Sequence, residues 1–324
     1  MKNELLVMAV LASSAVLAGC SDNNAEAAFV TEDNVALTVT VSDALTRISG
    51  VPSGEDSVSD LQILVFDSKG TLETYKHGTG NSISLTCTSG EKHIAAFVNY
   101  GRQVSVGNID GLTAVTTDLA DNQTGNLVMA GEKSVVLTAS GNVDVSVKRV
   151  AARIGISRIE NAMMLDQHRK MSFEVKAVYL VNVAGDKMFF SESEPGSWYN
   201  KTTVEEGAPS FLYDAVEDGL VASGNAYTGA HYFYSYPNHT EHDVSGGEWC
   251  ARKTRLVVEA SLDGTTYYYP LTLDDVESNT AYSYELKITR PGSLSPDVPV
   301  DDAVAGVTVK VEDWVELPSV FETI

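Results

Sequence analysis

Three histidines lie close together near the middle of the second half of the sequence and could ligate a metal with neighbouring acids. They are His231, His239 and His242, with Glu241 and Asp243 beside them. Zinc sites use tetrahedral sets of His, Cys and carboxylate ligands, mostly as tightly spaced pairs on defined elements. The spacing here is loose and falls in a predicted loop, so exposed loop histidines are the favoured interpretation. We expect no metal ion and no cofactor.

The same stretch carries aromatic residues that could bind a sugar or a protein surface. They are Tyr232, Phe233, Tyr234 and Tyr236, and Trp198, Tyr199 and Trp249 lie near them in sequence. Aromatic rings bury large areas, and Tyr and Trp add a polar tip. Strand and core positions are nevertheless the favoured explanation.

The sequence contains no pattern typical of a catalytic site. GxSxG, HExxH and P-loop patterns are absent, as is GxGxxG followed by a helix. The many scattered carboxylates single out no acid/base pair, although glycosidase carboxylates leave no short signature. We expect no enzyme, and keep a secreted glycan hydrolase as an alternative that a hydrolysis screen would test.

Cysteine chemistry is predicted at the amino-terminal end. An uncharged apolar run over 5–17 has the length of a signal peptide and ends in the lipobox Leu17-Ala18-Gly19-Cys20. Cys20 is expected to become an acylated amino terminus, with palmitate as an acyl chain, that holds the precursor to a membrane. Cys87 and Cys250 form either one disulfide or two buried thiols, and buried thiols are favoured because the two lie in different predicted domains.

The charge balance excludes one class of partner. The chain has 44 acidic and 22 basic residues and a net charge of −22, so its field repels phosphate backbones. We expect no nucleic-acid partner. A basic cluster stands out against this background, and it either bridges domains or subunits through carboxylates or forms the wet face of a strand: Lys148, Arg149, Arg153 and Arg158.

Short alternating strands separated by Gly, Asn, Asp and Ser clusters position these residues. Hardly any window has a helical period, apart from one short helix predicted over 109–120. Strand spacing of this kind favours antiparallel sandwiches, with a domain boundary near 146–150. The predicted strands cover 35–41, 61–66, 82–85, 93–99, 134–137, 143–147, 153–159, 173–183, 255–260, 266–273, 281–289 and 307–311.

Two distant strands share one pattern. The first strand has an apolar face made of Val35, Leu37, Val39 and Val41, and the last repeats it with Val307, Val309 and Val311, followed by Trp314, Val315 and Leu317. Arg47 follows the first strand and precedes an exposed, protease-accessible stretch over 48–60. Cutting there would free the first strand and leave a groove and a sheet edge that can recruit a foreign strand. The alternative is that 307–311 simply completes its own sandwich.

Several segments in order carry a family resemblance. They are the lipobox at Cys20, NVALTVTV, Arg47, LQILVFDSKG, LVMAGEKSVVL, VDVSVKRVAARIGI, and YELKITRPGSLSPDVPV followed by VTVKVEDW. Together they resemble the major fimbrillins, the type V pilins of Bacteroidales, over nearly the whole chain and least over 190–250. This resemblance implies an all-β fold of two tandem antiparallel β-sandwich domains of transthyretin-like, Greek-key type.

The resemblance also implies how such a chain is used. A lipoprotein precursor, lipidated at Cys20, reaches the outer membrane, is cut by an arginine-specific protease between Arg47 and Ile48, and polymerises when the C-terminal strand of one subunit completes its neighbour. Ile48 departs from the small residue common there in the family. The domains would be 1–19 signal peptide, 20–47 lipidated pro-segment with the removable first strand, 48–147 and 148–324, with the donor segment over about 306–324.

The function expected on this basis is a fimbrial shaft subunit that supports adhesion and biofilm formation. Its partners would be identical subunits, the anchor and tip subunits, the protease, the outer membrane through the precursor lipid, and a host protein or glycan. A tip or anchor subunit stays an alternative, as does a monomeric surface lipoprotein that binds glycan or host protein through 190–250. Cleavage at Arg47 separates the shaft subunit from the monomeric lipoprotein.

Overall fold

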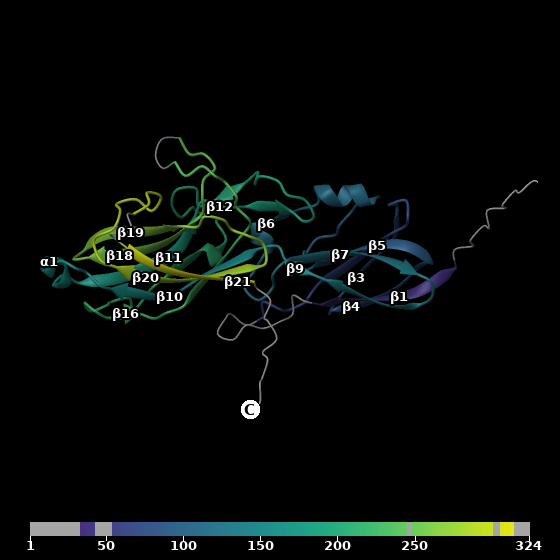
Figure 1. Ribbon diagram of the computed structural model, residues 1–324, viewed down its shortest axis with the longest axis horizontal. Coiled ribbons are helices and arrows are strands. Elements are labelled where there is room, and N and C mark those ends of the chain that lie inside the picture. The colour runs from purple at the N-terminus through teal and green to yellow at the C-terminus, as the bar shows by residue number, and fades with distance from the viewer. Residues whose placement is uncertain (1–32, 43–53, 245–247, 301–304, 314–324) are drawn as a thin grey trace, which may run out of the picture. The chain divides into compact units, whose positions relative to one another are not determined.

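The computed structural model describes residues 33–42, 54–244, 248–300 and 305–313 (Figure 1). Strands make up nearly all of the regular structure, so the predicted all-β class is confirmed. The helical segments are short: α1 (Asp166–Arg169) and 3-10 turns at Ile109–Ala114, Leu119–Asp121 and Ser210–Leu212. Among the described residues, no helix is long and apolar enough to cross a membrane.

The helix predicted over 109–120 is wrong in part. A 3-10 turn ends at Ala114, and Thr116–Asp118 forms strand β6 instead. Thr116 and Thr117 are β-branched, which favours an extended backbone, and the Asp118 side chain then accepts a hydrogen bond from the Ala120 N–H to start the next turn. The helical spacing of the apolar residues was therefore overridden by local backbone preference.

Two sheets pack on one apolar core in the first part of the chain. One has the order β4 (Ser82–Thr88), β1 (Asn34–Ser42), β8 (Gly141–Ser146), and the other β3 (Leu72–Gly78), β2 (Leu61–Phe66), β5 (Gly90–Val98), β7 (Met129–Leu137), β9 (Lys148–Arg149). Their shared core contains residues of β1, β2, β4, β5, β7 and β8. Alternating apolar residues on facing sheets form such a sandwich.

Two more sheets follow in the sequence. One has the order β16 (Ala226–Tyr227), β10 (Ala152–Asn161), β20 (Thr280–Ile288), β21 (Ala305–Asp313), with β17 (His231–Ser235) also on β10. The other has the order β15 (Tyr213–Ala215), β11 (Phe173–Val181), β18 (Arg255–Leu262), β19 (Thr265–Thr272). Most ladders are antiparallel, but β1 with β8 and β10 with β20 are parallel, which the sequence-based expectation did not include.

A larger core joins these sheets to the outer face of β2 and β5. It takes Leu64 and Phe66 from β2 and extends in sequence to Ile288, so every residue of β2 is buried. Two small ribbons complete the described fold: β12 (Val183–Ala184) with β14 (Trp198–Tyr199), and β13 (Asp186–Met188) with β6. The core crosses position 147, and the division of the chain into two domains there stays a proposal.

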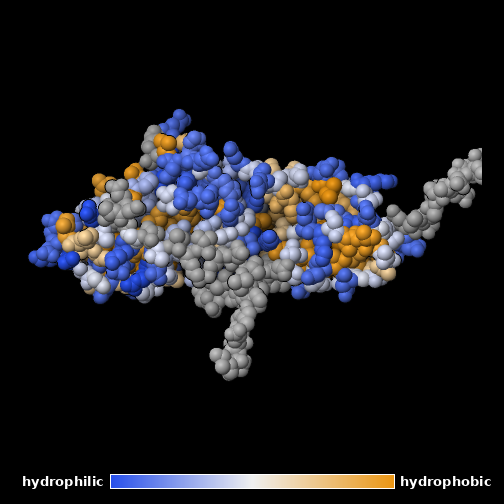
Figure 2. All heavy atoms as spheres, viewed as in Figure 1, coloured by the Kyte–Doolittle hydropathy of each residue, from blue (hydrophilic) through white to orange (hydrophobic). Residues whose placement is uncertain are grey.

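Large apolar side chains on the surface are spread over several elements. Figure 2 shows hydrophobic residues in separate areas of the visible face among hydrophilic ones. The most exposed of them are Leu294, Leu220 and Val136, at 77%, 71% and 63%. They come from distant parts of the sequence and two of them lie outside regular elements, as expected for single exposed residues on a soluble surface.

Candidate functional site

Strand β1 is the central strand of its sheet. It pairs antiparallel with β4, from Asn34–Thr88 to Thr40–Ser82, and parallel with β8, from Leu37–Gly141 to Ser42–Ser146. Its four inward side chains are no more than 5% exposed: Val35, Leu37, Val39 and Val41. The strand therefore fills a slot between two others, and both of its backbone edges are hydrogen-bonded.

The outward face of β1 is polar and contacts the same two neighbours. The hydroxyls of Thr38 and Ser84 are 2.9 Å apart, and those of Thr40 and Ser82 are 3.3 Å apart. On the β8 side, the Ser42 hydroxyl donates to a carboxylate oxygen of Asp144 at 2.9 Å. Each contact forms only in this register of β1, so the outward side chains also favour this register.

Cys87 lies on β4, beside the start of β1, and its side chain belongs to the core. It pairs with Val35 across the ladder and its residue is only 3% exposed. Burial raises the pKa of its thiol, the Glu73 carboxylate adds to this rise, and the Lys92 ammonium opposes it. Cys87 and Cys250 are both free, but Cys250 is exposed, so the expectation of two buried thiols is wrong for Cys250.

A partly buried ion pair lies beside the first residues of β1. The Lys92 ammonium is 2.8 Å from a Glu73 carboxylate oxygen and donates to the Thr88 hydroxyl at 2.8 Å. The Thr88 N–H donates to the other Glu73 oxygen. Burial raises the pKa of Glu73, but the bonds from Lys92 and Thr88 outweigh it and hold the pKa below its ordinary value. Thr88 is the residue opposite Asn34, so this pair closes the sandwich where β1 begins.

A second buried cluster fixes the chain between β1 and β2. The Glu55 carboxylate accepts from the Arg153 guanidinium at 2.7 Å and from the Tyr234 hydroxyl at 2.7 Å, and the Glu55 carbonyl accepts from Arg149 at 3.2 Å. All four residues are at most 5% exposed. Burial lowers the pKa of Arg149 to about 10, so it stays charged at neutral pH. Two of the four predicted basic residues thus bind Glu55, Arg153 at its carboxylate and Arg149 at its backbone carbonyl.

The chain bends sharply just before Glu55. Gly54 has a φ of 91°, a conformation that favours glycine, and a Cβ there would lie 3.1 Å from the Gly125 Cα. The predicted cleavage residues Arg47 and Ile48 lie outside the described residues, as does the predicted lipidation site Cys20. Glu55 is thus held in the core only a few residues after the predicted cut.

The candidate donor strand β21 lies at the edge of its sheet. It pairs antiparallel with β20 over its full length, from Thr280–Asp313 to Ile288–Ala305, and within the described residues β20 is its single partner in the sheet order. Val307, Val309 and Val311 fall within this strand, whereas Trp314, Val315 and Leu317 lie outside the described residues. Strands β1 and β21 belong to different sheets of the same chain.

A third buried cluster precedes β21. The Asp297 carboxylate accepts from Arg252 at 2.5 Å, from Arg255 at 2.8 Å and from the Asn182 amide at 2.8 Å. Arg255 also pairs with Asp243. Asp297 is 4% exposed, and burial lowers the pKa of Arg255. The segment leading to β21 is therefore tied to β18, while β21 itself continues at the sheet edge.

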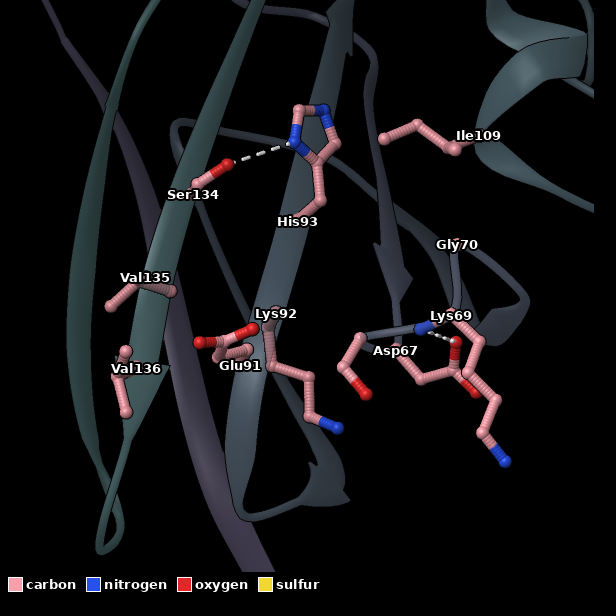
Figure 3. A pocket seen from close by; sticks show the side chains of 11 residues that line it. Asp67, Lys69, Gly70, Glu91, Lys92, His93, Ile109, Ser134, Val135 and Val136 are labelled. Carbon is pink, nitrogen blue, oxygen red and sulfur yellow. Dashed lines mark hydrogen bonds between the residues drawn. The ribbon is translucent and has the colours of Figure 1, made fainter.

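A shallow hollow of about 650 Å³ lies over β5 and β7, next to the turn that contains Asp67 (Figure 3). His93 contacts the Ser134 hydroxyl at 3.1 Å and Glu132 at 3.2 Å. Asp67 accepts from the Thr71 and Lys69 amides, which lower its pKa. These polar groups bind one another or the backbone, so their role in the fold accounts for their positions.

The loop predicted for the histidine stretch is wrong in part. Its first residues form β17, where His231 is 8% exposed and contacts Asp214 and the Tyr227 hydroxyl, both at 3.0 Å. His239 lies 3.7 Å from Glu277 at the surface. In the parts of the chain that the structure describes, no three His, Cys, Asp or Glu side chains are arranged to hold a metal.

The aromatic residues divide between core and surface. Phe233, Tyr234 and Tyr236 are fully buried and belong to the large core. Trp198 and Trp249 are half-buried and meet edge to face, with ring centres 5.5 Å apart. The core explanation therefore holds for most of the stretch.

Comparison with known proteins bears on this arrangement. The family model for the major fimbrial subunit protein (FimA) matches residues 34–168, which begin with β1. The chain is similar to major fimbrial subunits, as its sequence predicts. It is 24% identical to the major fimbrium subunit FimA type-2 and 25% identical to FimA type-3, both from Porphyromonas gingivalis, with 97% of this chain and 98% of each relative covered.

Solved structures share the fold of this chain. A cell adhesion protein from Bacteroides eggerthii matches with a TM-score of 0.66 at 18% identity, covering 88% of this chain and 97% of that one. A fimbrilin from Porphyromonas gingivalis W83 matches with a TM-score of 0.62 at 19% identity, covering 88% and 98%. The tip fimbrial protein Mfa3 of Porphyromonas gingivalis, with a C-terminal truncation, matches with a TM-score of 0.54 at 15% identity. The match covers 87% of this chain and 100% of that one.

The residues that the sequence did not single out are the carboxylates Glu55 and Asp297, which are buried, and Glu73, which is partly buried. Each is one of many acids in an acidic chain, and its partners come from distant positions. The sequence pointed to one of these clusters only through its basic residues. Arg149 and Arg153, which stand out in an acidic chain, are the basic members of the Glu55 cluster.

Proposed function

We propose that this chain is the structural shaft subunit of a cell-surface fimbrium. Its precursor is a lipoprotein, acylated at Cys20 and held to the outer membrane, and an arginine-specific protease cuts between Arg47 and Ile48. The freed β1 leaves, and the C-terminal segment of another copy, over about 306–324, takes its place. Anchor and tip subunits would end the fibre, which would serve adhesion to a host protein or glycan and biofilm formation.

The observation that carries this proposal is the position of β1 between β4 and β8. Both neighbours stay linked to the rest of the subunit without β1, because β4 and β8 also contribute to the core that the β2 sheet closes. Loss of β1 would expose an apolar groove bordered by two open strand edges. Such edges recruit an extended segment by β-augmentation.

The balance of interactions favours exchange over return of β21 to its own sheet. In the sheet of its own subunit, β21 forms one ladder, with β20, whereas a strand in the β1 slot forms two ladders. Each large apolar side chain that becomes buried contributes roughly 1.5 to 3 kcal/mol. An incoming strand therefore gains a second ladder, its three valines fill the apolar groove, and the joint should dissociate slowly.

The presence of β21 as a separate edge strand supports a shaft position. An anchor subunit would keep its lipid, and a tip subunit would lack a usable donor strand or carry a further binding domain. Here Arg47, the predicted cleavage residue, and an edge strand over Ala305–Asp313 occur in one chain. A subunit with both can accept one neighbour and donate to another, which is what a repeating fibre requires.

The test is to treat purified precursor with an arginine-specific protease, then read the new amino terminus by mass spectrometry and the size by light scattering. We expect a chain that starts at Ile48 and grows into multimers. The matched control ends at Val304 and should be cut at the same bond without growing. A full-length chain that is cut at Arg47 and stays monomeric would contradict the proposal and favour the monomeric adhesin.

A further inference from the structure

The patterns of β1 and β21 are similar enough to fix the register of the exchanged strand. This step rests on the proposed function. The two strands have nine residues each. We propose that β21 of a second copy enters the groove in the direction of β1, with Val309 at the place of Val39.

In this register, each inward position of the groove receives an apolar residue. Ala305, Val307, Val309 and Val311 replace, in order, Val35, Leu37, Val39 and Val41, positions at most 5% exposed in the precursor. Gly306 and Thr308 are exposed in the subunit's own sheet, so they already occupy the outward face of β21. The charged Asp313 falls just beyond the groove.

Other registers are worse for definite reasons. A shift of one residue turns Thr308, Lys310 and Glu312 into the core, because side chains alternate between faces. A shift of two in one direction places Asp313 at the buried position of Val41, where its charge would lose water without gaining a partner. A shift of two in the other direction removes Val311 from the groove and brings in a smaller alanine.

The outward positions also match. Thr308 takes the place of Thr38, whose hydroxyl lies 2.9 Å from that of Ser84. Lys310 takes the place of Thr40, which is paired across the ladder with Asp144 on β8. The hydroxyl that donates to Asp144 in the precursor belongs to Ser42 and leaves with β1.

Two further charges lie near Asp144. The Lys133 ammonium donates to the backbone carbonyl of Asp144 at 2.7 Å, and Glu312 would take the place of Ser42, diagonal to Asp144. Lys310 is directly opposite the carboxylate, and opposite charges facing each other across strands attract. The Lys310–Asp144 pair therefore favours this register over its neighbours.

Cross-linking between subunits tests the register. The processed chain carries Ser84→Cys and Thr308→Cys, with Cys87→Ala and Cys250→Ser to remove other thiols, and is oxidised after polymerisation. Because the two positions face each other in the proposed joint, we expect a ladder of disulfide-linked multimers on a non-reducing gel. The matched control pairs Ser84→Cys with Lys310→Cys, one pleat out of register, and should give at least about 10-fold less linkage.

The outcomes separate this inference from the function on which it rests. Fibres that link through the control pair, or through neither pair, overturn the register and leave strand exchange standing. A wild-type chain that is cut and stays monomeric overturns both. As a second measurement, Lys310→Glu should slow polymerisation roughly 3- to 10-fold at low salt, and adding Asp144→Lys should restore it. Equal rates for Lys310→Glu and wild type would contradict the charge pair.

Discussion

At the scale of single residues, buried carboxylates hold the chain on either side of the exchanging strands. Glu55 joins Arg153 and Tyr234 after β1, and Asp297 joins Arg252 and Arg255 before β21. A buried charge is stable only when it is paired and hydrogen-bonded, so each cluster tolerates few changes. Both clusters would remain intact in a processed subunit that starts at Ile48.

The substitution Glu55→Gln should destabilise the protein strongly. It removes the charge that compensates Arg153, whose side chain is 5% exposed, and breaking a buried pair in this way costs about 3 to 5 kcal/mol. Urea unfolding of the wild type and the variant would measure the loss. Glu91→Gln, at an exposed position, is the control and should change the free energy of unfolding by less than about 0.5 kcal/mol. A small effect at Glu55 would contradict the assigned pairing.

Glu73 gives the fold a defined dependence on pH. Its pKa is lowered in the folded protein, so its contribution to stability is present above the ordinary pKa and is lost as the pH falls through the lowered one. We expect Glu73→Gln to be less stable than wild type at pH 7, by about 1 to 2 kcal/mol. The difference should shrink on acidification from about pH 5 to pH 3. Unfolding curves that stay parallel across this range would rule out the contribution.

At the scale of elements, the proposed exchange requires β1 to contribute to the precursor and not to the processed subunit. Leu37→Ala removes a fully inward side chain, 1% exposed, and should lower the stability of the precursor by about 2 to 5 kcal/mol. The same substitution should leave the melting temperature and size of the assembled fibre unchanged, because β1 has left. Thr40→Ala, on the outward face, is the matched control. A fibre weakened by Leu37→Ala would mean that β1 stays in place.

The elements were predictable where the signal is local. The alternating faces of 35–41 and 307–311 predict strands directly, and strands β1 and β21 form there. Short strands such as β17 were missed because His231 and its neighbours are held by β10, a partner far away in the sequence. The helix predicted over 109–120 was too long, because the helical spacing of apolar residues continues beyond Ala114, where the 3-10 turn ends.

The candidate site was likewise predictable only where the sequence signal is local. One face of β1 is apolar in the sequence and buried in the structure. The Glu55, Glu73 and Asp297 clusters could not be predicted, since a buried ion pair depends on which distant residues the fold brings together. The exposure of Cys250 likewise depends on tertiary packing and not on its local sequence.

At the scale of the whole molecule, a chain with one acceptor and one donor builds a fibre of indefinite length. A processed subunit that ends at Val304 can accept a strand but cannot donate one. Mixed with full-length chains, it should therefore occupy one end of each fibre and shorten the mean length in proportion to its share, as measured by electron microscopy. Fibres of unchanged length at equal amounts of the two chains would contradict donation by the C-terminal segment.

The thiol of Cys87 tests the central claim most directly, because it is buried beside β1 while Cys250 is exposed. Maleimide labelling of a soluble precursor that starts after Cys20 should modify Cys250 and spare Cys87. After cleavage at Arg47, a chain that ends at Val304 should become labelled at Cys87, whereas full-length chains that have polymerised should be protected again. Protection of Cys87 in the cleaved, truncated chain would show that β1 does not leave its groove, and would contradict the account.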